Sequence, residues 1–264
     1  MIEFVKYHGA GNDFILIDNR QGIINLSEQD IQFLCDRHFG IGGDGLMLLE
    51  LSQGVDFVMK YYNSDGSSDM MCGNGGRCIV AFAHSLGLIK GDNTTFLAPD
   101  GKHNAEIKSY SNDEYIIKLS ISDVSEIKVF EDGEYLNTGT SHFVKFCEDV
   151  DLIDIIPQGR AIRYDKRFDF ASGANANFVQ VVSENNLKIR TYERGVEDET
   201  LACGTGITAS AIAYANKFNI TSNQVNIKAR GGDLRVHFQR QGDRFSQIYL
   251  EGPAKRVFKG EIEI

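Results

Sequence analysis

The chain of 264 residues contains only three prolines and no apolar run long enough to cross a bilayer. So few prolines leave no disordered linker and no collagen-like segment. A membrane-spanning helix needs about 20 predominantly apolar residues, so none is predicted. Glu3 and Lys6 interrupt the N-terminal stretch that a signal peptide would keep apolar. These absences predict a folded protein located in the cytoplasm.

Positive charge is also scarce. The chain has 27 Lys and Arg side chains against 37 Asp and Glu, a formal net charge of −10. Nucleic acids and anionic membranes attract basic surfaces, so neither is an expected partner. The expected partner is a small molecule.

The cysteines are odd in number and show no CxxC spacing: they are Cys35, Cys72, Cys78, Cys147 and Cys203. This pattern argues against a disulfide framework and against a zinc ribbon. We therefore expect five thiols and no metal site. The question becomes which of the thiols react.

An internal repeat organises the chain. Cys72-Gly73-Asn74-Gly75 recurs as Cys203-Gly204-Thr205-Gly206, a shift of 131 residues between positions 72 and 203. The same shift relates Val58 to Ile189, Tyr61 to Tyr192 and Gly101 to Gly232. In each copy a strand-like run (56–63, 187–194) precedes the motif, and an apolar, helix-like stretch (77–88, 207–218) and a second strand follow it.

The repeat predicts an α+β fold of two pseudo-symmetric halves, each a mixed β-sheet or barrel wrapped around a central helix. The halves are expected at residues 1–120 and 121–251. Ser27 with Asp30 resembles a capping box, which predicts a helix that continues to Gly40 and buries Cys35. Cys78, on the first helix, and Cys147, in a predicted strand, are interpreted as structural.

The motif has chemical consequences where it starts a helix. Backbone N–H groups at a helix N-terminus bind anions, and the helix dipole lowers the pKa of a thiol placed there. Two such thiols on opposite faces of a carboxylate-bearing ligand suit one reaction especially well. One thiolate removes a proton from the carbon next to the carboxylate, and the other thiol returns a proton with inverted configuration. Such a reaction requires neither a metal nor pyridoxal phosphate, so no cofactor is expected.

Six motifs in one order resemble the diaminopimelate epimerase family over essentially the whole chain: HGAGNDF (8–14), GIGGDG (40–45), NSDG (63–66), MCGNGGRC (71–78), YERG (192–195) and ACGTG (202–206). The resemblance implies cofactor-independent interconversion of LL- and meso-2,6-diaminopimelate, a step of bacterial lysine and peptidoglycan precursor synthesis. It also implies a site in the cleft between the halves, and a last strand (252–264) that returns to the first half. The sequence does not determine the oligomeric state; a homodimer is one expectation.

The resemblance also implies residue roles. Cys72 and Cys203 would be the acid and base. Gly73-Asn74 and Gly204-Thr205 would hold the reacting carboxylate. Asn12, Asn63 and Asn175 would bind polar groups of the substrate, and Arg194 would pair with its distal carboxylate. Glu193 would hold the reacting amino group, and His142 and Glu193 would tune the thiols.

Two positions depart from the family pattern. Where the family commonly has Met-Gly-Asn-Pro-His, this chain has Thr138-Gly139-Thr140-Ser141-His142, so Thr140 replaces an expected substrate-binding Asn. Gly45 stands where some members carry a contacting side chain. Both departures bear on substrate identity more than on reaction type.

Three alternatives stay open. One is a racemase or epimerase of another amino acid, such as proline, hydroxyproline or histidine, although Asn63, Asn175 and Arg194 favour a substrate with a second charged head. Another is a non-catalytic amino-acid-binding protein, which would not need two thiols. The third is a thiol hydrolase, which predicts acylation of one cysteine and no exchange at carbon.

Overall fold

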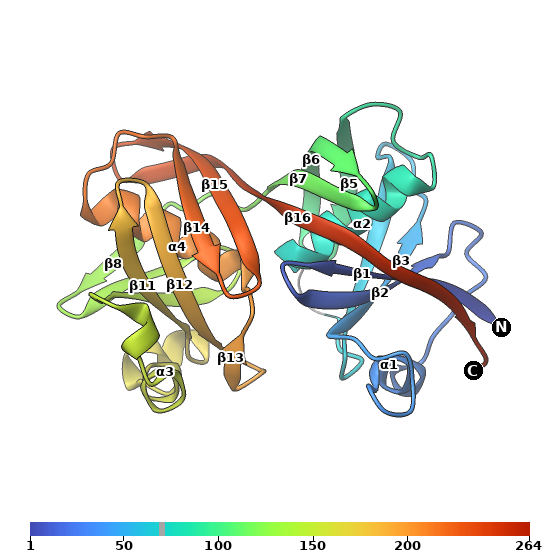
Figure 1. The fold of residues 1–264 in the computed structure, drawn as a ribbon, viewed down its shortest axis with the longest axis horizontal. Coiled ribbons are helices and arrows are strands. Elements are labelled where there is room, and N and C mark those ends of the chain that lie inside the picture. Colours follow the sequence, from blue (N-terminus) through green and yellow to red (C-terminus); the bar gives the residue numbers. More distant parts are fainter. Residues whose placement is uncertain (69–71) are drawn as a thin grey trace. The chain divides into compact units, whose positions relative to one another are not determined.

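The computed structural model describes residues 1–68 and 72–264, and its contacts divide the chain into two compact units (Figure 1). Unit 1 comprises Met1–Leu119 and Gly252–Ile264, and unit 2 comprises Ser120–Glu251. Met71, the first residue of the MCGNGGRC motif, lies outside the described residues. The chain passes from unit 2 back to unit 1 within β16 (Arg244–Ile262), the long strand coloured red in Figure 1.

Unit 1 is a mixed sheet that closes on itself. Its strands are β1 (Ile2–Gly9), β2 (Asn12–Asp18), β3 (Gly45–Glu50), β4 (Phe57–Asn63), β5 (Asn93–Ala98), β6 (Gly101–Ser111), β7 (Glu114–Ser120) and the second part of β16. They pair in this order, and β16 pairs with both β7 and β1, which completes a ring. The β2–β3 and β4–β5 pairings are parallel, and the other pairings in the ring are antiparallel.

Helix α2 (Gly73–Ser85) packs against the strands of this ring. Its residues from Gly73 to Ala83 are all buried, and it contacts β1, β2, β3 and β4. Most of its side chains are apolar, as expected of a helix buried on every side, and Asn74 and Arg77 are its buried polar exceptions. The central helix of unit 1 is therefore the one that begins directly after Cys72.

Unit 2 has a similar succession of strands. Its strands pair in the order β16, β15 (Gly232–Gln241), β14 (Gln224–Ala229), β12 (Asn186–Glu193), β11 (Asn175–Ser183), β10 (Ser141–Phe146), β9 (Gly133–Asn137) and β8 (Ile127–Phe130), and β13 (Asp198–Thr200) pairs with β12. Helix α4 (Gly204–Lys217) is buried from Gly206 to Ala215 and contacts β9–β12, β14 and β15. Helix α3 (Ile155–Arg163) packs on β11 and β12, and two 3-10 helices cover Val150–Leu152 and Lys166–Ala171.

The 131-residue shift found in the sequence also relates the elements. Adding 131 to the bounds of β5 gives 224–229, the bounds of β14, and adding it to the start of α2 gives 204, the start of α4. The parallel pairs β2–β3 and β4–β5 have counterparts in β10–β11 and β12–β14. The predicted α+β fold of two similar halves, each with a central helix, is confirmed.

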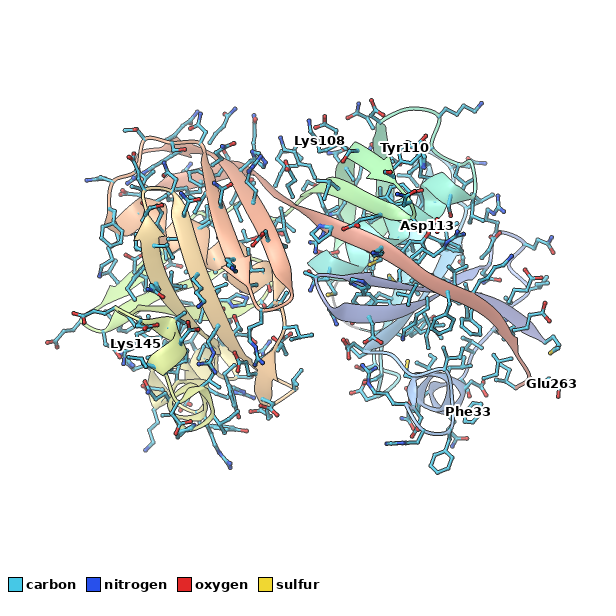
Figure 2. The ribbon with its side chains drawn as sticks, in the orientation of Figure 1. Phe33, Lys108, Tyr110, Asp113, Lys145 and Glu263 are labelled. Atoms are coloured by element: carbon cyan, nitrogen blue, oxygen red, sulfur yellow. The ribbon has the colours of Figure 1, made fainter. Side chains whose placement is uncertain are left out.

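Helix α1 (Glu28–Cys35) begins as predicted but ends early. The Ser27 hydroxyl accepts from the backbone N–H of Asp30, and the Asp30 carboxylate accepts from the backbone N–H of Ser27, so the capping box is present. The helix ends at Cys35 rather than at Gly40, because Asp36 is extended and the chain from 36 onward turns. Cys35 is buried as expected, whereas Phe33 lies on the outer side of the helix (Figure 2).

No helix in the described part of the chain is long and apolar enough to cross a membrane.

Candidate active site

Each repeat places its cysteine at the N-cap of the central helix. Cys72 is half-buried directly before α2, and Cys203 is buried directly before α4. Both have extended backbones, and neither side chain caps the helix. The N–H groups of the first helical turn carry the positive end of the helix dipole, which stabilises a thiolate or a bound carboxylate.

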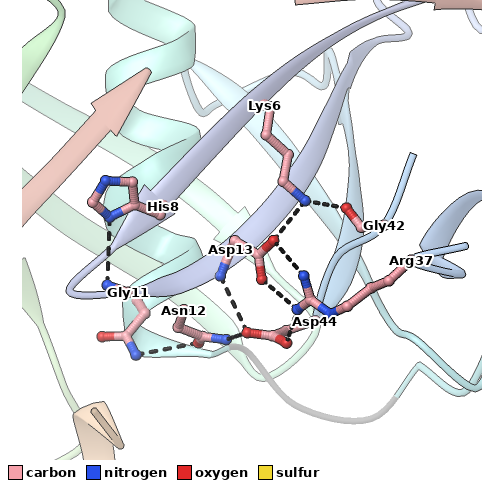
Figure 3. Close-up of polar contacts among 9 residues, drawn as sticks. Lys6, His8, Gly11, Asn12, Asp13, Arg37, Gly42 and Asp44 are labelled. Carbon is pink, nitrogen blue, oxygen red and sulfur yellow. Dashed lines mark hydrogen bonds and ion pairs between the residues drawn. The ribbon is translucent and has the colours of Figure 1, made fainter. Parts of the chain in front are cut away.

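The Cys72 side chain lies against the amide of Asn12, a predicted substrate-binding residue in β2. Cys72 Sγ is 3.4 Å from Asn12 Oδ1, and Asn74 Nδ2 donates to the same oxygen at 3.2 Å. Asn12 Nδ2 donates to Asp44 Oδ2 at 2.5 Å (Figure 3). The structure thus brings together Cys72, Asn12 and Asn74, and it adds Asp44 to them.

Asp44 belongs to a network of charges from three segments of unit 1. Arg37 Nη2 lies 2.7 Å from both Asp44 Oδ1 and Asp13 Oδ1, and Lys6 Nζ lies 2.7 Å from Asp13 Oδ2 (Figure 3). Lys6 also donates to the carbonyl oxygen of Gly42. Burial alone would raise the pKa of Asp13, but hydrogen bonds from Arg37 and Lys6, with their charges, lower it to about 2.

Arg77 is fully buried under the first turn of α2. It donates to Gly73 O at 3.2 Å, to Asn74 Oδ1 at 2.8 Å and to Pro253 O at 3.2 Å, all neutral oxygen atoms. Burial lowers the pKa of Arg77 to about 10. Its donors fix the side-chain amide of Asn74, because a guanidinium only donates and the carbonyl oxygen must therefore face it.

Asn63, at the end of β4, belongs to a separate set of contacts. Its Oδ1 accepts from the Tyr61 hydroxyl at 2.9 Å, and its Nδ2 donates to Ser67 Oγ at 2.9 Å. A Cβ on Gly45 would lie 2.7 Å from Tyr62 O and 3.0 Å from the Tyr61 ring. Tyr61 therefore crowds the place where some family members carry a side chain.

A buried polar cluster surrounds Cys203. Cys203 Sγ is 3.5 Å from Thr205 Oγ1, which lies 2.9 Å from His142 Nε2 and 3.1 Å from Thr140 Oγ1. His142 Nε2 also lies 2.9 Å from Thr140 Oγ1. Burial, with the nearby charge of Arg194, lowers the pKa of His142 to about 3, so its imidazole is neutral at pH 7.

Two asparagines on one face of β11 hold this cluster. Asn177 Nδ2 lies 3.1 Å from His142 Nδ1, and Asn177 Oδ1 accepts from the Thr191 hydroxyl at 3.0 Å. Asn175 Nδ2 donates to Ser141 O at 2.9 Å and lies 3.4 Å from Thr140 Oγ1.

Glu193 and Arg194, two predicted substrate-binding residues at the end of β12, contact other protein groups in this structure. The backbone N–H of Arg194 donates to Asn175 Oδ1 at 2.8 Å, and its guanidinium donates to Ala171 O at 2.9 Å. Glu193 Oε2 accepts from the Thr200 hydroxyl at 2.7 Å. Arg194 and Asn175 are thus connected, whereas Glu193 contacts β13.

Asp44 and Asn177 are among the residues of these clusters to which the sequence analysis assigned no role. Asp44 lies in the glycine-rich segment 40–45, which the sequence indicated without assigning the carboxylate. Asn177 lies two residues after Asn175, a spacing that puts both side chains on one face of a strand. Only the pairing of β10 with β11, which places His142 opposite Asn175, brings Asn177 to the imidazole.

The other three cysteines have the surroundings of structural residues. Burial raises the pKa of the Cys35 thiol to about 12 and also raises the pKa values of Cys78 and Cys147. Cys147 follows β10 rather than lying within it, and its Sγ is 3.6 Å from Val179 O. The described residues hold no group of three or more His, Cys, Asp or Glu side chains placed to bind a metal ion.

Structural comparison shows the fold. A Bacillus anthracis phenazine biosynthesis protein of the PhzF family superimposes with a TM-score of 0.77 at 16% identity, covering 100% of this chain and 99% of that one. A probable proline racemase from Agrobacterium radiobacter gives a TM-score of 0.72 at 12% identity, covering 100% of this chain and 93% of that one. These likenesses extend over both units.

Sequence comparison is more specific. The family model described as diaminopimelate epimerase matches residues 4–121 and 134–257. The diaminopimelate epimerase of Flavobacterium psychrophilum is 48% identical over 99% of this chain and 100% of its own length. That of Chlorobaculum tepidum is 42% identical over 97% of this chain and 99% of its own length. The chain belongs to the diaminopimelate epimerase family.

Proposed function

We propose that this protein interconverts LL- and meso-2,6-diaminopimelate without a cofactor, in lysine and peptidoglycan precursor synthesis. The observation that carries the proposal is full-length similarity to enzymes of that name, together with a cysteine at the N-cap of each central helix. A binding protein would need the two anion-binding helix ends but not the two thiols.

The proposed reaction conserves protons and electrons. One thiolate takes the proton from the α-carbon, and the other thiol delivers its proton to the opposite face of the same carbon. The N–H groups of Gly73-Asn74 and Gly204-Thr205 would hold the carboxylate, onto which negative charge spreads as the carbon becomes planar. One C–H bond breaks and one forms, so the product differs from the substrate only in configuration.

The proposed binding residues divide by chemistry. The guanidinium of Arg194 suits the distal carboxylate, and the carboxylate of Glu193 suits an ammonium group. Asn12, Asn63 and Asn175 would bind the remaining polar groups of the substrate. In this structure these side chains contact other protein groups. Substrate binding would therefore exchange some of those hydrogen bonds for contacts with the two amino-acid ends of the substrate.

Proton NMR of the protein with LL-diaminopimelate in deuterated water tests the proposal. We expect deuterium at an α-carbon together with meso product. Both should be lost in Cys72→Ala and in Cys203→Ala and retained in Cys147→Ala, the matched control. Absence of exchange with this substrate, or full activity of either single variant at a reactive cysteine, would overturn the proposal. Exchange with proline instead would assign the chain to another substrate.

We place the reaction in the cytoplasm, because both thiols must stay reduced and the chain's five cysteines are all thiols. A homodimer is the proposed assembly. Light scattering after size exclusion tests it, and a monomer mass would refute it.

A further inference from the structure

A surface pocket in unit 2 is lined by four positively charged side chains. It has a volume of about 380 Å³ and lies on strands β12 and β14, which run side by side (Figure 1). Pockets that bind small molecules have volumes of about 300–1,000 Å³. The charged residues of the lining are Asp151, Lys188, Arg190, Lys228 and Arg230. A chain with a net charge of −10 thus gathers positive charge in one small hollow.

The register of the sheet brings two of these cations together. Strands β12 and β14 pair in parallel, with Lys188 opposite Lys228. Neighbouring strands are about 4.8 Å apart, and like charges at opposed positions repel each other. Two residues further along, Arg190 and Arg230 converge on the same carboxylate, that of Glu199. Such a block of cations opposes folding unless negative charge lies among the side chains.

Glu199 supplies negative charge at one end of the pocket. It accepts from Arg190 Nε and Nη2 at 2.7 and 2.8 Å and from Arg230 Nη1 at 2.8 Å. Arg190 also donates to the carbonyl oxygens of Val150 and Ile153, at 3.2 and 2.9 Å, so its guanidinium is fixed by the protein. The Arg230 side chain is 55% exposed, and no residue that the structure describes accepts from its Nε or Nη2.

Asp151 supplies negative charge at the other end, where it pairs with Lys188. The hydrogen bond from Lys188, together with the charges of Lys188, Arg190 and Lys228, lowers the pKa of Asp151. Lys228 is exposed and forms no ion pair or hydrogen bond with any described residue, although Asp233 lies opposite it on β15. The donors left for a ligand are therefore centred on Lys228 and on the outer side of the pocket.

The chemistry of these donors suits a phosphoryl group. Such a group carries about −1.5 to −2 charges at pH 7 and three strong acceptor oxygens. Lysine and arginine only donate hydrogen bonds, and both bind phosphate. A single carboxylate would bring half of that charge, and a nucleic acid would be repelled by the net charge of −10.

We propose that this pocket binds a small molecule with a terminal phosphoryl group, which Lys188, Lys228 and Arg230 hold. None of the residues that line the pocket belongs to the proposed catalytic or substrate-binding set, so the site is additional to the proposed function. The phosphoryl group supplies the negative charge that the opposed lysines lack.

Titration of ¹⁵N-labelled protein with inorganic pyrophosphate, followed through the backbone amide resonances, tests the proposal. We expect saturable shifts at residues 188–190 and 228–230, with a Kd at or below about 1 mM. Shifts confined to 73–74 and 204–205, at the two anion-binding helix ends, would overturn the proposal. Absence of saturable shifts, or equal shifts with acetate, would overturn it as well.

Variants of the pocket change the affinity in opposite directions. Lys228→Gln should raise the Kd for pyrophosphate at least about tenfold, because a charge-assisted hydrogen bond is lost. Asp151→Asn should lower the Kd, since it releases Lys188 and removes a negative charge beside the anion. Lys145→Gln is the matched control, at a lysine of β10 outside the pocket, and should leave the Kd unchanged (Figure 2).

An unchanged Kd in Lys228→Gln, or a higher Kd in Asp151→Asn, would contradict the assigned site. The amide spectrum of each variant also shows whether it is folded. Binding does not require turnover, so a protein without epimerase activity would refute the proposed function and leave this inference to be decided by the titration.

Ribose 5-phosphate and inorganic phosphate distinguish the two sources of a phosphoryl group. Tighter binding of the ester, which the volume of the pocket leads us to expect, would support a site for phosphorylated metabolites. Tighter binding of inorganic phosphate would support a site for the free anion. Failure of both to shift residues 188–190 and 228–230 would overturn the proposal.

Discussion

Arg77 on α2 donates through Nε to the carbonyl oxygen of Pro253 on β16, at 3.2 Å and 176 residues away in sequence. The same guanidinium donates to Gly73 O and Asn74 Oδ1 at the start of the helix. It therefore connects the helix that carries Cys72 to the strand that closes unit 1.

Arg77→Lys is expected to destabilise the protein by about 2–4 kcal/mol, because one ammonium cannot replace three directed donors and charged hydrogen bonds contribute about 1.5–3 kcal/mol each. Urea unfolding measures the change. Arg256→Lys is the control, since its ion pair with Asp113 is exposed and worth about 0–1 kcal/mol. Equal losses of unfolding free energy in the two variants would show that the buried contacts of Arg77 stabilise the protein no more than an exposed ion pair does.

Gly206 and Gly75 occupy equivalent positions in the two repeats but have different space around them. A Cβ on Gly206 would lie 2.4 Å from Asn177 Oδ1, whereas one on Gly75 would lie 3.4 Å from its nearest neighbour, Met47 Sδ. Gly206→Ala should cost about 1–3 kcal/mol by overpacking, and Gly75→Ala should be neutral or slightly stabilising. Thermal unfolding of the two variants side by side measures the difference in stability. An unfolding temperature of Gly206→Ala equal to that of the parent protein would refute the assigned contact.

His142 should make stability depend on pH in a defined window. Its pKa is about 3 in the folded protein against an ordinary value of 6.5, so between these values the unfolded chain binds one more proton. Stability should therefore rise with pH through this window by up to about 1.4 kcal/mol per pH unit, with the contribution complete above the unfolded pKa.

His142→Gln should flatten that slope, and His38→Gln, at an exposed histidine, should leave it intact. Chemical unfolding at a series of pH values between 4 and 7 provides the comparison. If the parent protein and His142→Gln show the same slope, the histidine is not buried in its neutral form.

Asp13 should stabilise the protein at neutral pH and lose this effect in acid. Its folded pKa of about 2 lies below the ordinary value of 3.8, so the stabilisation is present above the ordinary value and disappears as the pH falls through about 2. Asp13→Asn should cost about 2 kcal/mol or more at pH 7, because it also leaves the buried Lys6 without its carboxylate.

The double variant Lys6→Met/Asp13→Asn should lose less stability than Asp13→Asn alone, since no buried charge is left unpaired. Urea unfolding at pH 7 and at pH 2.5 measures both variants. A loss from Asp13→Asn that is the same at the two pH values would contradict an electrostatic origin.

The repeat was the most informative sequence feature for the fold. A shift of 131 residues correctly predicted two similar halves with a central helix each. This was possible because each apolar helix and the Cys-Gly turn before it can be recognised from a short contiguous stretch of sequence. The end of α1 was less predictable. Gly40 is a reasonable stop signal, but the chain already leaves the helix at Asp36, where the backbone N–H groups of His38 and Phe39 donate to the Asp36 carboxylate.

The sequence by itself determined the family, the two thiols and their place before a helix, because each depends on a short contiguous motif. Tertiary structure decided which groups face those thiols. Asp44 reaches Asn12 only because β2 pairs with β3, and Asn177 reaches His142 only because β10 pairs with β11. Hydrogen-bond polarity depends on such long-range neighbours, which no local pattern of residues specifies.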